Sequence, residues 1–143
     1  MRIYAVIDTN VIVSSMISHN SESPTIEIMK CIFSGRIVPL YSAYLIDEYR
    51  RVLERPKFGL SIERIQSTIR SIMYLGIHIE PTESGVILPD KKDLPIYEIT
   101  LDTQDVGSYL VTGNVKHFPQ MPFVVTPREM LEIMSQLYSG NNI

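Results

Sequence analysis

Short, continuously hydrophobic runs alternate with longer amphipathic stretches along this chain. Five such runs predict strands, at residues 3–7, 36–40, 77–80, 109–112 and 123–125. A strand that is hydrophobic without alternation is buried on both faces, as in a parallel sheet that helices cover on both sides. The pattern therefore favours a parallel sheet.

Helix-start and helix-stop signals occupy most of the gaps between these runs. The predicted helices cover residues 23–35, 42–56, 61–76 and 93–107, and a further helix begins at residue 126. Pro24 directly after Ser23 is typical of a first helical turn, and Thr126 with Glu129 forms a capping box. This alternation predicts an α/β fold, a three-layer α/β/α sandwich with a central parallel sheet of four to five strands.

The composition indicates one globular domain over residues 1–143, because 45% of the residues are hydrophobic and 20% are charged. Cys31 is the one cysteine, so no internal disulfide forms, and its hydrophobic helical setting predicts a core position. Neither a signal peptide nor an apolar run long enough to span a membrane is found. We therefore expect a cytoplasmic protein without a membrane partner.

The overall charge argues mildly against a nucleic-acid partner, because the net charge is −3 and the pI is about 5.6. Basic residues nevertheless cluster locally, at Arg50, Arg51, Arg55 and Lys57, at Lys91 and Lys92, and at Lys116 beside His117. Each cluster is either a solvated surface or a phosphate-binding site, and the sequence leaves both open.

A carboxylate, Asp8, directly follows the most hydrophobic predicted strand. In parallel α/β sheets, ligands bind outside the carboxyl ends of the strands, near the point where the strand order reverses. Asp8 is therefore a candidate ligand-binding residue. The alternative is a turn or helix cap, a role that Thr9 or Asn10 would serve equally well.

Glu48 lies at the edge of the hydrophobic stripe of its predicted helix. On a helical projection it falls near Leu45 and Val52, whereas Asp47 falls on the opposite side. We therefore expect Glu48 to lean toward the protein and Asp47 toward water. A partly buried carboxylate needs a metal or a basic partner, and pairing with Arg51 or Arg55 at helical spacing is the alternative.

Two further acids, Asp90 and Asp93, stand at or before the start of a predicted helix. Carboxylates at this position are favoured by the helix dipole and often serve only as caps. Glu98 lies further along the same helix, and the pattern does not decide which way it points.

The segment after the fourth predicted strand repeats the first pattern. Thr112, Gly113 and Asn114 follow a hydrophobic strand, and Gly113 favours a tight turn of the backbone. Asn114 offers a carbonyl oxygen without a charge. His117 follows closely, although a lone histidine is more often a surface or packing residue.

These positions predict a cluster of oxygen ligands, with Asp8 and Asn114 from strand ends and Glu48 and Asp93 from helices. Several carboxylates in one pocket repel one another unless a cation neutralises them, and oxygen ligands select Mg²⁺ or Mn²⁺. Such an ion polarises a phosphate group and lowers the pKa of water. No P-loop, dinucleotide, zinc-protease or nucleophile motif competes, so the residues favour metal-dependent phosphodiester hydrolysis.

The ordered motifs of the chain resemble those of the PIN-domain family, nearly from end to end. They are VIDTNVIVSSMIS, GRIVPLYSAYLIDEYRRVLERPKF, DKKDLPIYE, YLVTGNVKHFP and VVTPREMLEIM. More narrowly, they resemble the branch of that family assigned to toxins of bacterial and archaeal toxin–antitoxin systems. The resemblance implies a parallel α/β/α sandwich and a divalent-metal ribonuclease site of three or four acids.

Carried over by position, the resemblance implies a site of Asp8, Glu48 and Asp93, with Asp90 as a secondary metal ligand. Asn10 and Thr112 match polar positions that shape the site. The chain departs from the family pattern at Asn114 and Ser108, where the family often has acids. These replacements are expected to weaken the binding of a second metal ion.

The leading hypothesis is therefore a metal-dependent endoribonuclease, in which Asp8, Glu48, Asp93 and Asn114 act on RNA. The resemblance also implies a small antitoxin that blocks the site, and self-association as a homodimer. A second hypothesis is a PIN-like module with weak or no activity that binds RNA or a protein, motivated by Asn114 and the acidic pI. A third is a phosphatase with Asp8 as nucleophile, which usually requires an acid where this chain has Asn10.

Overall fold

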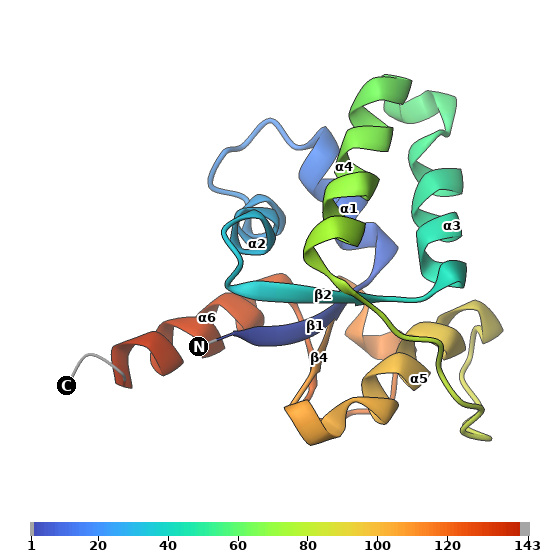
Figure 1. Ribbon diagram of the computed structural model, residues 1–143, viewed down its shortest axis with the longest axis vertical. Coiled ribbons are helices and arrows are strands. Elements are labelled where there is room, and N and C mark those ends of the chain that lie inside the picture. The colour runs from blue at the N-terminus through green and yellow to red at the C-terminus, as the bar shows by residue number, and fades with distance from the viewer. Residues whose placement is uncertain (1, 141–143) are drawn as a thin grey trace.

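Five parallel strands form the sheet at the centre of the molecule (Figure 1). The computed structural model describes residues 2–140. The strands are β1 (Ile3–Ile7), β2 (Ile37–Tyr41), β3 (Ile77–His78), β4 (Tyr109–Val111) and β5 (Val124–Val125), in the order β3-β2-β1-β4-β5. All pairs are parallel, and Ala5 at the centre lies between Pro39 of β2 and Tyr109 of β4. The predicted parallel α/β fold is confirmed.

Six helices flank the sheet within residues 2–140. They are α1 (Thr9–Ile17), α2 (Pro24–Phe33), α3 (Ala43–Leu53), α4 (Ile62–Leu75), α5 (Leu94–Asp102) and α6 (Pro127–Gly140). Figure 1 shows α1 to α4 on one side of the sheet and α5 on the other. At α3, α4 and α6 the capping follows the sequence signals: the Ser42 and Ser61 hydroxyls accept from the backbone N–H groups of Leu45 and Arg64, and Thr126 and Glu129 form the capping box. Ser23 occupies the N-cap position of α2, but its side chain makes no capping hydrogen bond.

The first helix, α1, was not among the predicted helices. Its sequence TNVIVSSMI is rich in β-branched residues and shows little amphipathic pattern. Five of the nine residues of this helix are buried. The predicted strand at 77–80 ends at His78, and the predicted helix at 93–107 already ends at Asp102. A short 3₁₀ turn and Gly107, with a left-handed φ of 64°, follow that end.

The strand order places the end of β1 beside the end of β4. The chain leaves β1 toward β2 on one side, whereas β4 pairs with β1 on the other side, so the order reverses between β1 and β4. The Asp8 backbone N–H donates to the carbonyl of Val111 at 2.9 Å and extends the pairing past the last β1 residue. Segments about a hundred residues apart therefore meet at the edge where α/β proteins bind ligands.

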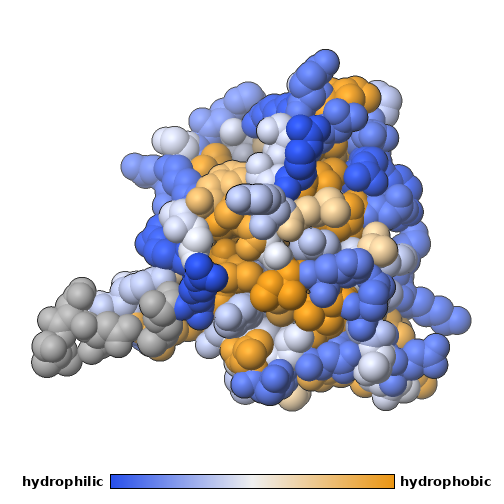
Figure 2. Space-filling model, in the orientation of Figure 1, coloured by the Kyte–Doolittle hydropathy of each residue, from blue (hydrophilic) through white to orange (hydrophobic). Residues whose placement is uncertain are grey.

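The core lies on both faces of the sheet. Cys31 is 3% exposed within it, as its sequence setting predicts. Glu98 is buried as well, and its carboxylate accepts a hydrogen bond from the backbone N–H of Ser84 at 2.5 Å. Figure 2 shows hydrophobic side chains at the centre of one face, bordered by hydrophilic ones. Among residues 2–140, no helix has the length and hydropathy needed to cross a membrane.

Candidate functional site

Asp8 is buried, with 7% of its surface exposed, directly after β1. Its carboxylate accepts three hydrogen bonds, from the Thr9 backbone N–H at 2.8 Å, the Asn10 amide at 3.0 Å and the Thr112 hydroxyl at 2.8 Å. Burial raises the pKa of Asp8, and these hydrogen bonds oppose that rise. Asp8 also occupies the N-cap position of α1, so the structural role that the sequence left open is present.

The turns after β1 and β4 are joined by side-chain hydrogen bonds. The Asn10 carbonyl oxygen accepts from the backbone N–H of Gly113 at 2.9 Å, and the Thr112 hydroxyl accepts from that of Asn114 at 3.0 Å. Gly113 does not have a positive φ, so the expected tight turn is not the reason for a glycine here. A Cβ at this position would lie 3.2 Å from the Asn10 oxygen, so the close approach favours glycine.

Glu48 is half-buried on α3, whereas its neighbour Asp47 is exposed. The orientation predicted by the helical projection is confirmed. Asp47 pairs with Arg51 at 3.8 Å, and within residues 2–140 Glu48 forms no ion pair with Arg51 or Arg55. Burial raises the pKa of Glu48, and the nearby charge of Asp8 raises it further.

Asp93 occupies the N-cap position of α5, but its side chain makes no capping hydrogen bond. Its Oδ2 atom is buried without a hydrogen-bond partner and lies 3.5 Å from Nδ1 of His117. Burial raises the pKa of Asp93, the charges of Asp8 and Asp90 raise it further, and His117 opposes the rise. Asp90 differs, because its exposed carboxylate accepts from the Lys92 backbone N–H at 3.0 Å. The cap interpretation therefore applies to Asp90 and not to Asp93.

All five predicted site residues line one cleft of about 500 Å³, namely Asp8, Glu48, Asp90, Asp93 and Asn114. His117 lines it as well, so this histidine belongs to the cleft. The wall also contains Arg55, from a basic cluster that the sequence left open as a phosphate-binding site, and Phe58 and Val52, for which the sequence predicted no site role. Glu48, Val52 and Arg55 are spaced four and three residues apart along the chain, and this spacing indicated a shared face.

The donors fit a hard divalent cation in their chemistry. They are carboxylate oxygens; burial and the charge of Asp8 raise the pKa of both Glu48 and Asp93, and Asp93 Oδ2 has no hydrogen-bond donor. In residues 2–140, however, no three His, Cys, Asp or Glu side chains stand close enough together to hold a metal ion. The cleft thus gathers suitable ligands without arranging them at coordination distance.

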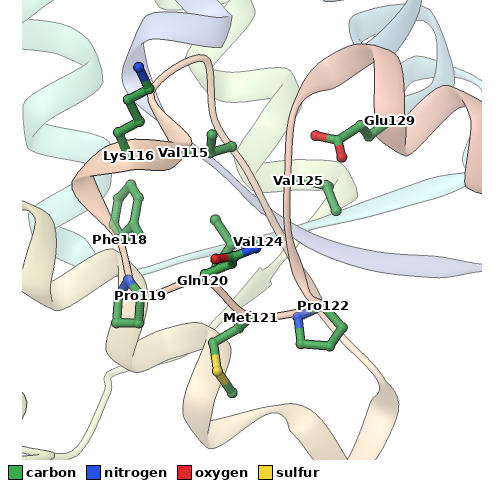
Figure 3. Close-up of a pocket in the computed structure, with 10 residues that line it drawn as sticks. All are labelled: Val115, Lys116, Phe118, Pro119, Gln120, Met121, Pro122, Val124, Val125 and Glu129. Carbon is green, nitrogen blue, oxygen red and sulfur yellow. The ribbon is translucent and has the colours of Figure 1, made fainter.

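A neighbouring cavity of about 400 Å³ lies between the β4–β5 connection and the start of α6 (Figure 3). Most of its lining residues are hydrophobic, and Lys116 extends away from its centre. Glu129 is the one acid among its lining residues, and this carboxylate accepts from the Thr126 backbone in the capping box. This cavity therefore lacks the paired carboxylates of the acidic cleft.

Ser108, the second departure from the family pattern, lies outside the acidic cleft. It is fully buried before β4, and its hydroxyl contacts Thr103 at 2.7 Å and the Thr100 carbonyl at 3.2 Å. This position is at the amino end of β4, whereas Asp8 and Asn114 lie at the carboxyl edge of the sheet. The charge missing at Ser108 is therefore not missing from the cleft.

Comparison with known proteins identifies the family. The family model of the PIN domain matches residues 4–116, a range that contains all five predicted site residues. No curated protein matches the chain closely enough to count as a relative. The family match covers most of the chain, from β1 through the turn after β4. On this evidence the chain belongs to the PIN-domain family, whose members are generally nucleases.

Proposed function

We propose that this protein is a divalent-metal-dependent endoribonuclease that hydrolyses RNA phosphodiester bonds. The observation that carries the proposal is that three carboxylates line one cleft, where burial and the charge of Asp8 raise the pKa of both Glu48 and Asp93. Such an arrangement costs free energy unless a cation neutralises it. Perturbed carboxylates of this kind are typical of functional sites.

Asp8, Glu48 and Asp93 would hold Mg²⁺ or Mn²⁺, with Asp90 as a further ligand. Because no three such side chains are gathered at coordination distance in residues 2–140, binding would require the ligands to move closer together. When bound, such an ion supplies charge neutralisation at the phosphate and a lowered pKa of water. Hydrolysis in this way leaves a 5′-phosphate and a 3′-hydroxyl.

The remaining residues of the cleft would bind and orient the RNA. Arg55 and His117 line the cleft and provide N–H donors for phosphate oxygens. Asn114 offers an uncharged amide that orients a water molecule. Asn10 and Thr112 hold the Asp8 carboxylate in place through their hydrogen bonds.

The direct test is cleavage of a labelled RNA by the purified protein and by Asp8→Asn, with Mg²⁺ or Mn²⁺ and with a chelator. We expect metal-dependent cleavage by the unmodified protein and a loss of at least about a hundredfold in Asp8→Asn. The variant should keep its fold, because one amide oxygen can still accept from both Asn10 and Thr112, so only the hydrogen bond from the Thr9 backbone is lost. Equal cleavage by the two proteins would refute the assignment of Asp8.

A second candidate is a PIN-like module that binds RNA or a protein without cleaving. Two observations favour this module. Asn114 is uncharged where the family often has an acid, and no three acidic, histidine or cysteine side chains of residues 2–140 stand close enough to hold a metal ion. Thermal unfolding with increasing Mn²⁺ separates the two, because a ligand that binds the folded state raises its stability. A melting temperature that does not change with the Mn²⁺ concentration would support the non-catalytic module.

We further propose that the protein acts as a toxin in a toxin–antitoxin pair. The support is the resemblance of its motifs to the toxin branch of the family, which also suggests a small antitoxin and a homodimer. Induced expression should arrest the growth of host cells, and Asp8→Asn should relieve the arrest. Unimpaired growth during expression of an active nuclease would count against the toxin role.

A further inference from the structure

A cavity of about 390 Å³, distinct from the one beside the β4–β5 connection, adjoins the acidic cleft. Ile17, the last residue of α1, and Phe58, in the 3₁₀ turn η1 (Pro56–Phe58), line both the cleft and this cavity. Ile17 is 40% exposed. The two spaces are therefore neighbours that share these two lining residues.

The charge of this cavity is opposite to that of the cleft. Lys57 and Arg64 line it together with His19, and none of its lining residues is an acid. Arg55 lies nearby on the wall of the cleft itself. Within residues 2–140, none of Arg55, Lys57 and Arg64 forms an ion pair, whereas Arg51 and Lys30 pair with acids on their own helices. A protein of net charge −3 thus keeps three unneutralised cations beside its acidic cleft.

An aromatic ring accompanies these cations. The Lys57 ammonium lies 5.2 Å from the centre of the Phe58 ring, and the Phe58 side chain is half-buried. Leu60 adds a second hydrophobic side chain to the same cavity. Proteins that bind single-stranded nucleic acids combine such elements, because bases pack on aromatic rings while cations contact the adjoining phosphates.

We propose that the cavity lined by Lys57, Phe58 and Arg64 binds the RNA nucleotides next to the bond that is cleaved. Lys57 and Arg64 contact the phosphates, and a base packs against Phe58 and Leu60. Bases inside a duplex are stacked and paired, so they cannot reach Phe58, and the RNA must be unpaired at this position. This inference rests on the proposed nuclease function of the adjoining cleft.

The test compares Lys57→Glu/Arg64→Glu with Arg2→Glu/Arg128→Glu, a control of equal charge change at exposed residues that line neither space. Binding of a fluorescent single-stranded RNA is measured at several salt concentrations, with circular dichroism to confirm folding. We expect the Lys57/Arg64 variant to bind at least about tenfold more weakly than the control, with a shallower salt dependence. Phe58→Ala should weaken single-stranded binding by about fivefold or more and leave duplex binding unchanged.

Hydrolysis of bis(p-nitrophenyl) phosphate with Mn²⁺ provides the second readout, because this small diester needs the cleft but not the cavity. Equal hydrolysis of the diester by the Lys57/Arg64 variant and by its Arg2/Arg128 control, with weakened RNA binding only in the Lys57/Arg64 variant, supports the inference. RNA binding by the Lys57/Arg64 variant that equals that of the control overturns the inference. Binding of polyglutamate is measured in the same way. A variant that loses affinity for polyglutamate but not for RNA also overturns the inference, because it would assign the cavity to an acidic protein. If the unmodified protein hydrolyses no diester, the nuclease proposal fails while the binding comparison still decides the role of the cavity.

Discussion

The Tyr49 hydroxyl donates a hydrogen bond to the backbone carbonyl of Ile7, the residue that precedes Asp8. Tyr49 follows Glu48 on α3 and is 1% exposed, and its burial raises the pKa of its hydroxyl well above the ordinary value. One buried contact therefore links the helix that carries Glu48 to the strand end that carries Asp8. We therefore expect this contact to help fix the spacing of Asp8 and Glu48.

Replacing Tyr49 with Phe should loosen this link. The Ile7 carbonyl would lose its side-chain donor, which should cost about 1–3 kcal/mol in the free energy of unfolding. Mn²⁺ affinity, measured by calorimetry, should fall several-fold. Tyr97→Phe is the matched control, because Tyr97 is also buried and no hydrogen bond of its hydroxyl is found within residues 2–140. Unchanged Mn²⁺ affinity in Tyr49→Phe would contradict the positioning role.

Replacing Glu48 with Gln should stabilise the metal-free protein at neutral pH. The pKa of Glu48 is raised above its ordinary value of 4.5 in the folded state, so the fold favours the protonated carboxyl. That contribution is complete below pH 4.5 and is lost as the pH rises through the raised pKa. At pH 7.5 we expect Glu48→Gln to melt about 1–4 °C above the unmodified protein, with the difference vanishing near pH 4. Asp47→Asn, beside it on the exposed face, should show no such gain.

Asp93 and Asp90 should differ in their effect on metal binding. Asp93 has an oxygen without a hydrogen-bond donor, whereas Asp90 already caps the turn η2 (Lys91–Asp93). Asp93→Asn should therefore weaken Mn²⁺ binding by about tenfold or more, as expected for the loss of a ligand. Asp90→Asn should weaken it by less. Affinity should also be higher at pH 7.5 than at pH 5.5, because protons compete with the metal for carboxyls whose pKa values are raised. Calorimetric titrations of both variants at both pH values check these outcomes.

Replacing Thr112 with Val should shift the pH dependence of cleavage. The Thr112 hydroxyl donates to Asp8 and accepts from the Asn114 backbone, and its bond to Asp8 opposes the rise of that pKa. Without it the pKa of Asp8 should rise, so the acid limb of the cleavage profile should move to higher pH. Thr112→Ser keeps the hydroxyl and should restore the original profile. A uniform loss of rate at every pH would instead indicate a structural role.

Local patterns in the sequence determined most elements and the orientation of Glu48. Strands that are hydrophobic throughout, serine caps and helical spacing are properties of neighbouring residues, so β1, α3 and α6 could be predicted from them. The burial of Glu48 relative to Asp47 followed in the same way, because an α-helix converts spacing directly into a face. The order of the motifs along the chain was sufficient to indicate the PIN-domain family.

The tertiary structure decided how the acids are used. Asp90 and Asp93 share one sequence context, but Asp90 caps a turn while Asp93 lies buried beside His117, because packing around α5 determines which carboxylate finds a backbone donor. The close contact of Gly113 with Asn10 depends on the pairing of β1 with β4, and that pairing joins residues about a hundred positions apart. Phe58 and Ile17 likewise meet only through the packing of α1 against α3 and the turn that follows it. Long-range packing of this kind leaves no periodic signal in the sequence, so the sequence indicated the acids that gather in the cleft but not the cavity beside it.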